Sequence, residues 1–306
     1  MGFAESFLLS EVSCSDLTAF FTLFIRNRTH LNNGTTLSSS LLSSLSGLWS
    51  RTGNTMSKAL VNTQAHYDIS NEMFAAFLSE DMTYSCPIWR VEDMGREGDH
   101  WWDVGQGDET LEQAQMRKIQ RFIDGARIKA ADHVLEIGSG WGSFAVEAAR
   151  RTGCRVTTVT LSKEQKIWVE GRVKKEGLAG RVEVLLRDYR DLEAPEEGFD
   201  KVVINHITIQ SRGTLMVEKI ENIGAHYART LRLWRERFLA KFESKIRPAL
   251  MREHPDMTAK TVEVFRRKWE YYFAYSEAGF LTKTLGDVII TVGREGAMEL
   301  MEGIPR

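Results

Sequence analysis

The stretch "VLEIGSGWGSFA", Val134 to Ala145, decides the fold. An apolar segment runs into three closely spaced glycines, and the residues after them favour a helix. A strand that enters a glycine-rich turn and continues as a helix is typical of sites that hold a nucleotide cofactor. Glycines in such a turn can also serve the backbone alone, so the motif by itself leaves both interpretations open.

The spacing of the glycines bears on which cofactor is held. A dinucleotide fingerprint has the form G-x-G-x-x-G. Here Gly138, Gly140 and Gly142 form G-x-G-x-G, and Glu136 stands two residues before them. S-adenosylmethionine carries no phosphate, and its amino-acid part needs close approach of the backbone, which glycine permits, and an acidic neighbour for its ammonium group. The pattern therefore favours S-adenosylmethionine over NAD.

Strand and helix patterns alternate on both sides of this turn. Strands are predicted over residues 133–138, 155–161, 182–188 and 199–204, with helices over residues 143–151 and 163–177. This alternation predicts a parallel sheet in an α/β domain. Another helix is predicted from about Thr110, a long helix over residues 226–246, and a last strand over residues 285–295.

Composition narrows the class of protein. The 306 residues include 40 basic and 42 acidic ones, so no excess of positive charge points to nucleic acid. Three scattered cysteines argue for a reducing compartment, and we expect a cytoplasmic protein. The most apolar run, Leu17 to Ile25, is too short to span a bilayer. The Ser/Leu-rich stretch over residues 35–58 is interpreted either as a linker with a short helix or as an amphipathic segment against lipid.

Several longer stretches together resemble the cyclopropane fatty acid synthases, including the mycolic acid cyclopropane synthases. They are "HYDISNEMFAAFLSEDMTYSCPIW" (66–89), "VLEIGSGWGSFA", "VTLSKEQ" (159–165), "RDYRDL" (187–192), "VEKIENIGAHYARTLRLWRERF" (217–238) and "WEYYFAYSEAGF" (269–280). The resemblance implies a Rossmann-like class I methyltransferase sheet flanked by helices. It also implies transfer of a methyl group from S-adenosylmethionine to the double bond of a phospholipid acyl chain, followed by loss of a proton and closure of a cyclopropane ring.

The resemblance also implies roles for individual residues. The residues that would contact S-adenosylmethionine are Tyr84, Ser85, Gly138, Gly140, Thr160 and Gln165, with Tyr189 beside the adenine. Cys86 and Tyr227 match residues that hold a bicarbonate ion, the base of the reaction. A further group of aromatic residues either lines a lipid tunnel or forms core: Trp269, Tyr271, Tyr272, Phe273, Tyr275 and Phe280.

The chain departs from the family pattern after "FDKVV", residues 199–203. The family continues with a loop that carries a glutamate, a helix, a further central strand and a His- or Ile-bearing turn. Here the chain runs straight into residues 204–224, and Ser276 replaces a cysteine of many relatives. We therefore expect an internal deletion near 203–205 and the loss of one central strand. Residues 1–60 would be a helical remnant of an N-terminal domain plus a linker, and residues 61–306 the methyltransferase domain.

Two structural outcomes follow from such a deletion. Either the last antiparallel hairpin closes directly on the fourth strand, or that strand is left as an exposed edge. Residues 202–210, "VVINHITIQ", are rich in β-branched side chains and could themselves extend as a strand.

Three functions remain in competition. The first is a cyclopropane synthase, the second a methyltransferase of another lipid or a sterol-like substrate, and the third a truncated, non-catalytic form that binds S-adenosylmethionine or lipid only. The substrate class implies contact with a membrane surface, for which the helix over residues 227–246 offers a basic side. That side consists of Arg229, Arg232, Arg235 and Lys241. An ordinary solvated face is the alternative, and the sequence does not indicate an oligomeric state.

Overall fold

The computed structural model describes residues 2–31, 71–90, 108–193, 195–204 and 215–294. The chain divides into two compact units. Unit 1 comprises Met1–Phe77, His100–Val104 and Tyr227–Gly286, and unit 2 comprises Leu78–Asp99, Gly105–His226 and Asp287–Arg306. The domain boundary expected near residue 60 lies outside the described residues and stays a prediction, as does the fold of residues 35–58.

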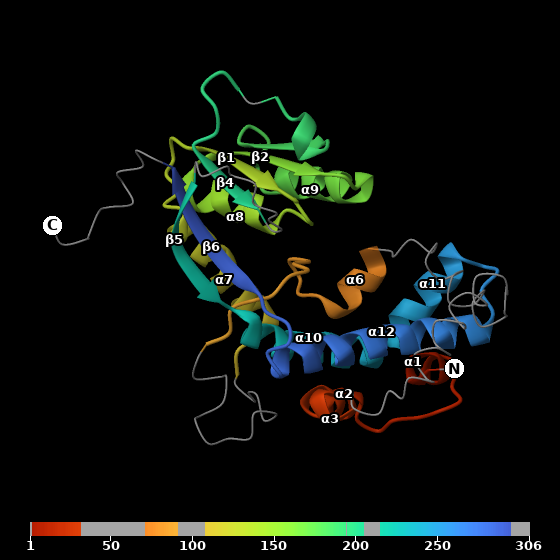
Figure 1. Ribbon diagram of the computed structural model, residues 1–306. Helices are drawn as coiled ribbons and strands as arrows, with labels where there is room; N and C mark the ends of the chain where they lie inside the picture. The colour runs from red at the N-terminus through yellow and green to blue at the C-terminus, as the bar shows by residue number, and fades with distance from the viewer. Residues whose placement is uncertain (1, 32–70, 91–107, 194, 205–214, 295–306) are drawn as a thin grey trace. The chain divides into compact units, whose positions relative to one another are not determined.

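Unit 2 contains a four-stranded parallel sheet in the order β3-β2-β1-β4 (Figure 1). Its strands are β1 (His133–Ile137), β2 (Arg155–Thr160), β3 (Val182–Leu186) and β4 (Lys201–Ile204). Helix α8 (Ser143–Thr152) connects β1 to β2, and α9 (Lys163–Lys175) connects β2 to β3. The predicted α/β fold with a parallel sheet is confirmed, and the elements begin and end within a few residues of their expected bounds.

Helix α7 (Leu111–Gly125) precedes the sheet and begins where the sequence indicated. Thr110 and Gln113 form a capping box, in which each side chain bonds the backbone N–H of the other residue. One face of α7 is apolar and packs with α8, α9 and the sheet into a single core. The most deeply buried members of that core include Ile119, Val134, Ala145, Ala148, Cys154, Val156 and Val169.

The last two strands of unit 2 form a separate antiparallel ribbon. Strands β5 (Leu215–Asn222) and β6 (Val288–Arg294) pair with each other, with an irregularity between Val217 and Lys219. Among the described residues, β4 pairs with β1 alone, and Val202 on β4 is 45% exposed. In this part of the chain the hairpin therefore does not close on the fourth strand, and β4 ends the sheet. Residues 205–210 of the β-branched stretch lie outside the described segments.

Unit 1 is helical. It contains α1 (Phe3–Leu8), α2 (Leu17–Arg26), α3 (Arg28–Leu31), α6 (Asn71–Phe77), most of α10 (Gly224–Lys241), the π-helical turn η5 (Phe242–Ile246), α11 (Arg247–Glu253) and α12 (Ala259–Leu281). Helix α2 packs against α12, where the rings of Phe21 and Tyr271 meet edge to face with centroids 4.9 Å apart. Among the helices described, none is both long and apolar enough to cross a bilayer.

An aromatic core joins α6, α10 and α12. The Phe77 ring lies 5.4 Å from Phe273 and 6.0 Å from Trp234 between centroids, and all three side chains are fully buried. Of the aromatic residues expected either to line a lipid tunnel or to form core, Phe273 is therefore a core residue. Tyr272 and Tyr275 are 42% and 52% exposed, and a tunnel formed by them stays a prediction.

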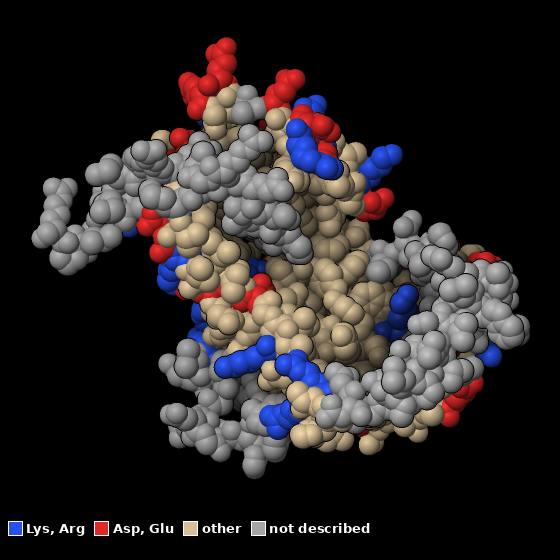
Figure 2. All heavy atoms as spheres, in the orientation of Figure 1, with Lys and Arg blue, Asp and Glu red and all other residues tan. Residues whose placement is uncertain are grey.

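The expected basic side of α10 differs from the structure. Arg232 Nε donates to Glu277 Oε1 at 2.8 Å, and Arg235 lies 3.3 Å from Glu277 Oε2. Glu277, on α12, is fully buried, and Arg229 is only 5% exposed. Helical spacing placed these arginines correctly on α10, but a carboxylate buried on the neighbouring helix draws Arg232 and Arg235 inward. On the face shown in Figure 2, basic and acidic side chains are interspersed, in keeping with the near balance of charge.

Candidate functional site

The turn after β1 has a backbone that only glycine adopts readily. Gly138, Gly140 and Gly142 have φ values of 93°, 49° and 83°, in the left-handed region that disfavours a Cβ. The backbone N–H groups of Gly138 and Ser139 both donate to Val159 O at 3.0 Å, which fixes the turn to the end of β2. The glycine pattern in the sequence therefore reflects a specific backbone path.

The three glycines meet different surroundings. A Cβ built on Gly142 would lie 2.7 Å from Cγ1 of Val169, so the missing side chain lets the turn pack against α9. A Cβ on Gly138 or Gly140 would have no atom of the described structure within 4 Å. Helix packing thus accounts for Gly142, whereas Gly138 and Gly140 leave open space in front of the turn, where a ligand could approach the backbone.

Glu136 lies inside the sheet. Its side chain is 1% exposed, and the Thr158 hydroxyl on β2 donates to its Oε2 at 2.6 Å. Burial raises the pKa of Glu136 to about 8, against the opposing effects of Thr158 and the Lys118 charge. The carboxyl group is therefore mostly protonated at neutral pH, and an ammonium group brought near it would favour the ionised form.

The remaining cofactor candidates of the sheet follow the carboxyl ends of its strands. The Thr160 hydroxyl, at the end of β2, donates to Gln165 Oε1 at 2.7 Å. Tyr189 lies in the short helical turn η4 (Tyr189–Asp191) after β3 and is 56% exposed. The glycine turn follows β1, so the candidates share the carboxyl edge of three adjacent parallel strands, where open α/β sheets bind their ligands.

Hydrogen bonds hold the segment from Ser79 to Cys86 beside the glycine turn. The Ser143 hydroxyl, one residue after Gly142, donates to Asp81 O at 2.5 Å. On α7, Gln115 Nε2 donates to Ser85 O at 2.8 Å and to Thr83 O at 3.3 Å. Tyr84 between them is 37% exposed. The structure thus brings Tyr84 and Ser85 into the same unit as the glycine turn and holds them there through the backbone.

Lys118 was not predicted as a site residue. Its Nζ donates to Ser85 Oγ at 2.5 Å and to Gln115 Oε1 at 3.0 Å, and the residue is 4% exposed. Burial lowers the pKa of Lys118 to about 8. The sequence did contain a signal for a buried lysine at this position. Lys118 lies four residues after Ala114 and seven after Leu111, on the apolar face of α7.

Cys86 is a buried thiol in unit 2. Its Sγ lies 3.3 Å from Pro87 O and 3.6 Å from Ile223 O, and burial together with Asp287 raises its pKa. Cys86 therefore remains protonated and can act as a weak hydrogen-bond donor. Trp89 N donates to His226 Nδ1 at 3.1 Å, which ties this segment to the start of α10.

Tyr227 belongs to unit 1. Its ring stacks on Phe280 with centroids 4.7 Å apart and meets Trp234 edge on at 6.0 Å. The joint role of Cys86 and Tyr227 in holding bicarbonate stays a prediction.

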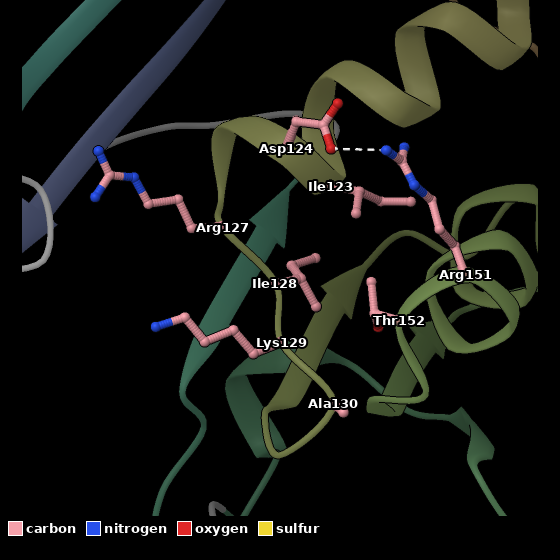
Figure 3. A pocket seen from close by; sticks show the side chains of 8 residues that line it. All are labelled: Ile123, Asp124, Arg127, Ile128, Lys129, Ala130, Arg151 and Thr152. Carbon is pink, nitrogen blue, oxygen red and sulfur yellow. Dashed lines mark ion pairs between the residues drawn. The ribbon is translucent and has the colours of Figure 1, made fainter. Parts of the chain in front are cut away.

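A pocket of about 420 Å³ lies elsewhere on unit 2 (Figure 3). It is lined by Ile123, Asp124, Arg127, Ile128, Lys129, Ala130, Arg151 and Thr152. Asp124 and Arg151 are paired at 3.0 Å, while the Arg127 and Lys129 side chains point away from that pair. This pocket adjoins the loop that leads into β1, at the amino edge of the sheet. We place the candidate cofactor site at the carboxyl edge, where the glycine turn lies.

Comparison with known proteins identifies the family. The family model for mycolic acid cyclopropane synthetase matches residues 54–211, just over half of the chain. The chain belongs to this family. The mycolic acid cyclopropane synthetase family consists of S-adenosylmethionine-dependent methyltransferases, so the methyltransferase class implied by the resemblance is confirmed.

Relatives in the family carry different names. The chain is 30% identical to the tuberculostearic acid methyltransferase UfaA1 of Mycobacterium tuberculosis, over 97% of this chain and 79% of that protein. It is 26% identical to the cyclopropane-fatty-acyl-phospholipid synthase of Escherichia coli K12, over 98% of this chain and 85% of that protein. The first alignment has 361 positions, whereas 97% of 306 residues is about 297, so roughly 64 positions have no counterpart in this chain.

Solved structures share the fold. The cyclopropane synthase MmaA2 of Mycobacterium tuberculosis has a TM-score of 0.56 and 18% identity, over 76% of this chain and 97% of that one. Coclaurine N-methyltransferase, solved with N-methylheliamine and SAH, has a TM-score of 0.63 and 15% identity, over 90% of this chain and 93% of that one. These similarities confirm the class I methyltransferase fold.

Proposed function

We propose that this chain binds S-adenosylmethionine at the carboxyl edge of β1, β2 and β3. We further propose that its lineage transfers the methyl group to the double bond of an unsaturated phospholipid acyl chain, giving a cyclopropane fatty acid. The observation that carries the proposal is the open backbone at Gly138 and Gly140, next to the fastened segment that contains Ser85. A ligand without phosphate, carrying an amino-acid group, suits such a turn.

The chain's own residues fit the parts of this cofactor. Backbone at Gly138 and Gly140 would approach the methionine part, Thr160 and Gln165 offer polar atoms after β2, and exposed Tyr189 offers an aromatic face for the adenine. When bound, S-adenosylmethionine supplies an activated methyl group on its sulfonium. Glu136 would neutralise the ammonium group, and ligand binding would then release a proton from this carboxyl group below its pKa of about 8.

Bicarbonate is the proposed base for ring closure. Burial keeps the Cys86 thiol protonated, so it can donate one weak hydrogen bond; that hydrogen points at the carbonyl oxygens of Pro87 and Ile223 and would have to turn to reach an anion. Tyr227 supplies a phenolic hydroxyl by the family pattern. The carbocation that follows methyl transfer needs a dry pocket with aromatic faces, which attract positive charge.

A second candidate is a non-catalytic form that binds the cofactor or lipid only. Among the described residues β4 pairs with β1 alone, which favours this candidate, because the family pattern places a further strand beside the fourth. A third candidate, a methyltransferase of another lipid, is supported by relatives named tuberculostearic acid methyltransferase and sphingolipid C9-methyltransferase. The second and third candidates both keep the proposed cofactor site, so binding of S-adenosylmethionine is tested first.

We also propose a cytoplasmic location, because the three cysteines are free, and contact with the membrane surface, because the proposed substrate is the acyl chain of a phospholipid. Arg232 and Arg235 are engaged with Glu277 and offer little charge for anionic lipid. Contact with lipid should therefore depend weakly on salt. The salt dependence of lipid binding can be measured by flotation with vesicles of phosphatidylglycerol or phosphatidylcholine at low and high salt. Binding that is lost in high salt would show that another basic surface is used.

Titration calorimetry with S-adenosylmethionine and S-adenosylhomocysteine tests cofactor binding. Gly140→Val should abolish the binding heat because the side chain would fill the open space in front of the turn. Gly177→Val is the matched control, because Gly177 also has a positive φ, of 70°, and a Cβ there also has no atom within 4 Å. Equal heats from the wild type and Gly140→Val would contradict the proposed site.

A further inference from the structure

Lys118 is a buried cation whose hydrogen bonds go to neutral groups. The lysine is 4% exposed, yet its Nζ contacts Ser85 Oγ and Gln115 Oε1 rather than a carboxylate. Burying an ammonium group is costly unless its charge is used or compensated. An apolar residue in this position of α7 would have been compatible with the core, so the charge calls for a functional explanation.

The chemistry of the lysine fixes the direction of the bond to Ser85. An ammonium group has three donors and no acceptor, so Ser85 Oγ must accept the hydrogen bond from Lys118. The Ser85 hydroxyl then keeps its own hydrogen for another acceptor, and among the described residues it has none. Gln115 holds Ser85 from a second direction, by donating to its carbonyl at 2.8 Å. Ser85 is thus held by hydrogen bonds to its carbonyl oxygen and to its Oγ, and its hydroxyl hydrogen can donate to a ligand.

The groups around Lys118 keep its charge available. Burial lowers its pKa to about 8, and Asp81, Cys86, Asp287 and Glu136 act in the opposite direction. All of them belong to unit 2, as do the glycine turn and Ser85. At neutral pH the ammonium form predominates, so Ser85 has a positive charge directly behind it.

A hydroxyl backed by a positive charge suits one part of the cofactor. S-adenosylmethionine carries an ammonium and a sulfonium, both positive, a neutral adenosine, and a single anion, the carboxylate of its methionine part. We propose that Lys118 is a positioning residue that holds Ser85 as a hydrogen-bond donor for this carboxylate. The inference rests on the proposed binding of S-adenosylmethionine and adds the residue that orients its amino-acid end.

Two ligands that differ in the amino-acid group provide the test. S-adenosylhomocysteine has the carboxylate, whereas 5′-methylthioadenosine keeps the adenosine and the thioether and lacks the amino-acid part. We expect Lys118→Met to weaken binding of S-adenosylhomocysteine by about 10- to 100-fold, the range for a hydrogen bond to a charged group. Binding of 5′-methylthioadenosine should change by less than about twofold, since it forms no such bond.

Ser85→Ala and the double variant complete the cycle. Ser85→Ala removes one oxygen atom, keeps the lysine, and should reproduce the selective loss even where Lys118→Met fails to fold. The double variant should lose little more than either single variant, because the two residues act through one bond. Lys175→Met removes a charge from the exposed surface of the same unit and should leave both affinities unchanged.

The outcomes separate this inference from the proposed function. If the wild type binds neither ligand, the cofactor proposal fails and the role of Lys118 fails with it. If the wild type binds both ligands, but the variants weaken both equally or leave S-adenosylhomocysteine unaffected, only the role of Lys118 and Ser85 is overturned. Loss confined to the ligand with the carboxylate supports it.

Discussion

A Cβ on Gly142 would lie 2.7 Å from Cγ1 of Val169, so the turn after β1 and the helix after β2 meet at a point that has no room for a methyl group. The same turn two residues earlier, at Gly140, faces open space. Two glycines of one motif therefore serve different purposes, and their substitutions should separate stability from binding.

Gly142→Ala should lower the free energy of unfolding more than Gly140→Ala. Both changes put a side chain on a left-handed backbone, which costs about 1–2 kcal/mol. Only the first also overpacks the contact with Val169, which typically adds about 1–3 kcal/mol. Urea unfolding followed by circular dichroism measures both. The variant with Gly142→Ala and Val169→Ala should be less destabilised than the sum of its single changes, and strict additivity would contradict the steric explanation.

Glu136 should make the protein less stable as the pH rises. Its pKa in the folded chain is raised to about 8 from an ordinary value of 4.5. Between these values the folded state binds more protons than the unfolded state, so stability falls with rising pH, by at most about 1.4 kcal/mol per pH unit. Urea midpoints from pH 5 to 8 should decline less for Glu136→Gln than for the wild type. Glu196→Gln, at an exposed site, should follow the wild type, and parallel curves for all three would refute the assignment.

Glu277 should be one of the most sensitive positions in unit 1. Its carboxylate is fully buried and receives hydrogen bonds from the Thr18 hydroxyl at 2.9 Å and from Arg232. Breaking a buried ion pair by removing one partner costs about 3–5 kcal/mol. Glu277→Gln should lie near the lower end, because the arginine side chains are 18–25% exposed and reach water. Thermal unfolding measures the loss, with exposed Glu236→Gln on α10 as the control; equal transitions would show that the cluster contributes little.

Cyclopropane synthase activity should be absent from this chain. By the family pattern the base site needs a glutamate and a His/Ile turn besides Cys86 and Tyr227, and the sequence predicts that the segment that carries them is missing here. Loss of a positioned base typically costs about 10²–10⁴-fold, and water entering an open pocket would also quench the carbocation. The measurement is the amount of cyclopropane lipid, determined by gas chromatography. It compares cells that express this chain, its Cys86→Ala variant, or a version with the segment restored. Cyclopropane lipid from the unrestored chain above the Cys86→Ala level would show that the missing segment is dispensable.

Local signals account for the part of the fold that the sequence predicted correctly. Thr110 begins α7 because its side chain caps the helix, and the glycines bend the chain after β1 because only they adopt its left-handed backbone. The strands β1 to β4 are short runs rich in apolar and β-branched residues between these signals. Each of these features depends on neighbours within a few residues, which a single sequence displays.

Long-range partners account for what the sequence did not show. Periodicity placed Arg232 and Arg235 on α10 but could not reveal that Glu277, more than 40 residues later, would be buried against them. In the same way, the apolar pattern of α7 predicts that the Lys118 side chain faces inward, but it cannot predict that Ser85 accepts its hydrogen bond. The separate ribbon of β5 and β6 depends on which strands are present to pair, and propensity alone cannot decide that.

The order β3-β2-β1 has a consequence for how the molecule opens. Every strand pair in this half of the sheet is formed between segments that follow one another within residues 133–186, joined by α8 and α9. Contacts between segments close in the chain form with little loss of loop entropy and do not need distant parts. The backbone amides of β1 and β2, the two interior strands of the sheet, should therefore exchange with deuterium most slowly, whereas those of β4 and the ribbon should exchange faster. A chain that loses a segment beyond β4 would keep the strand pairs of residues 133–186. It can therefore still bind the cofactor after it has lost the ability to catalyse the reaction.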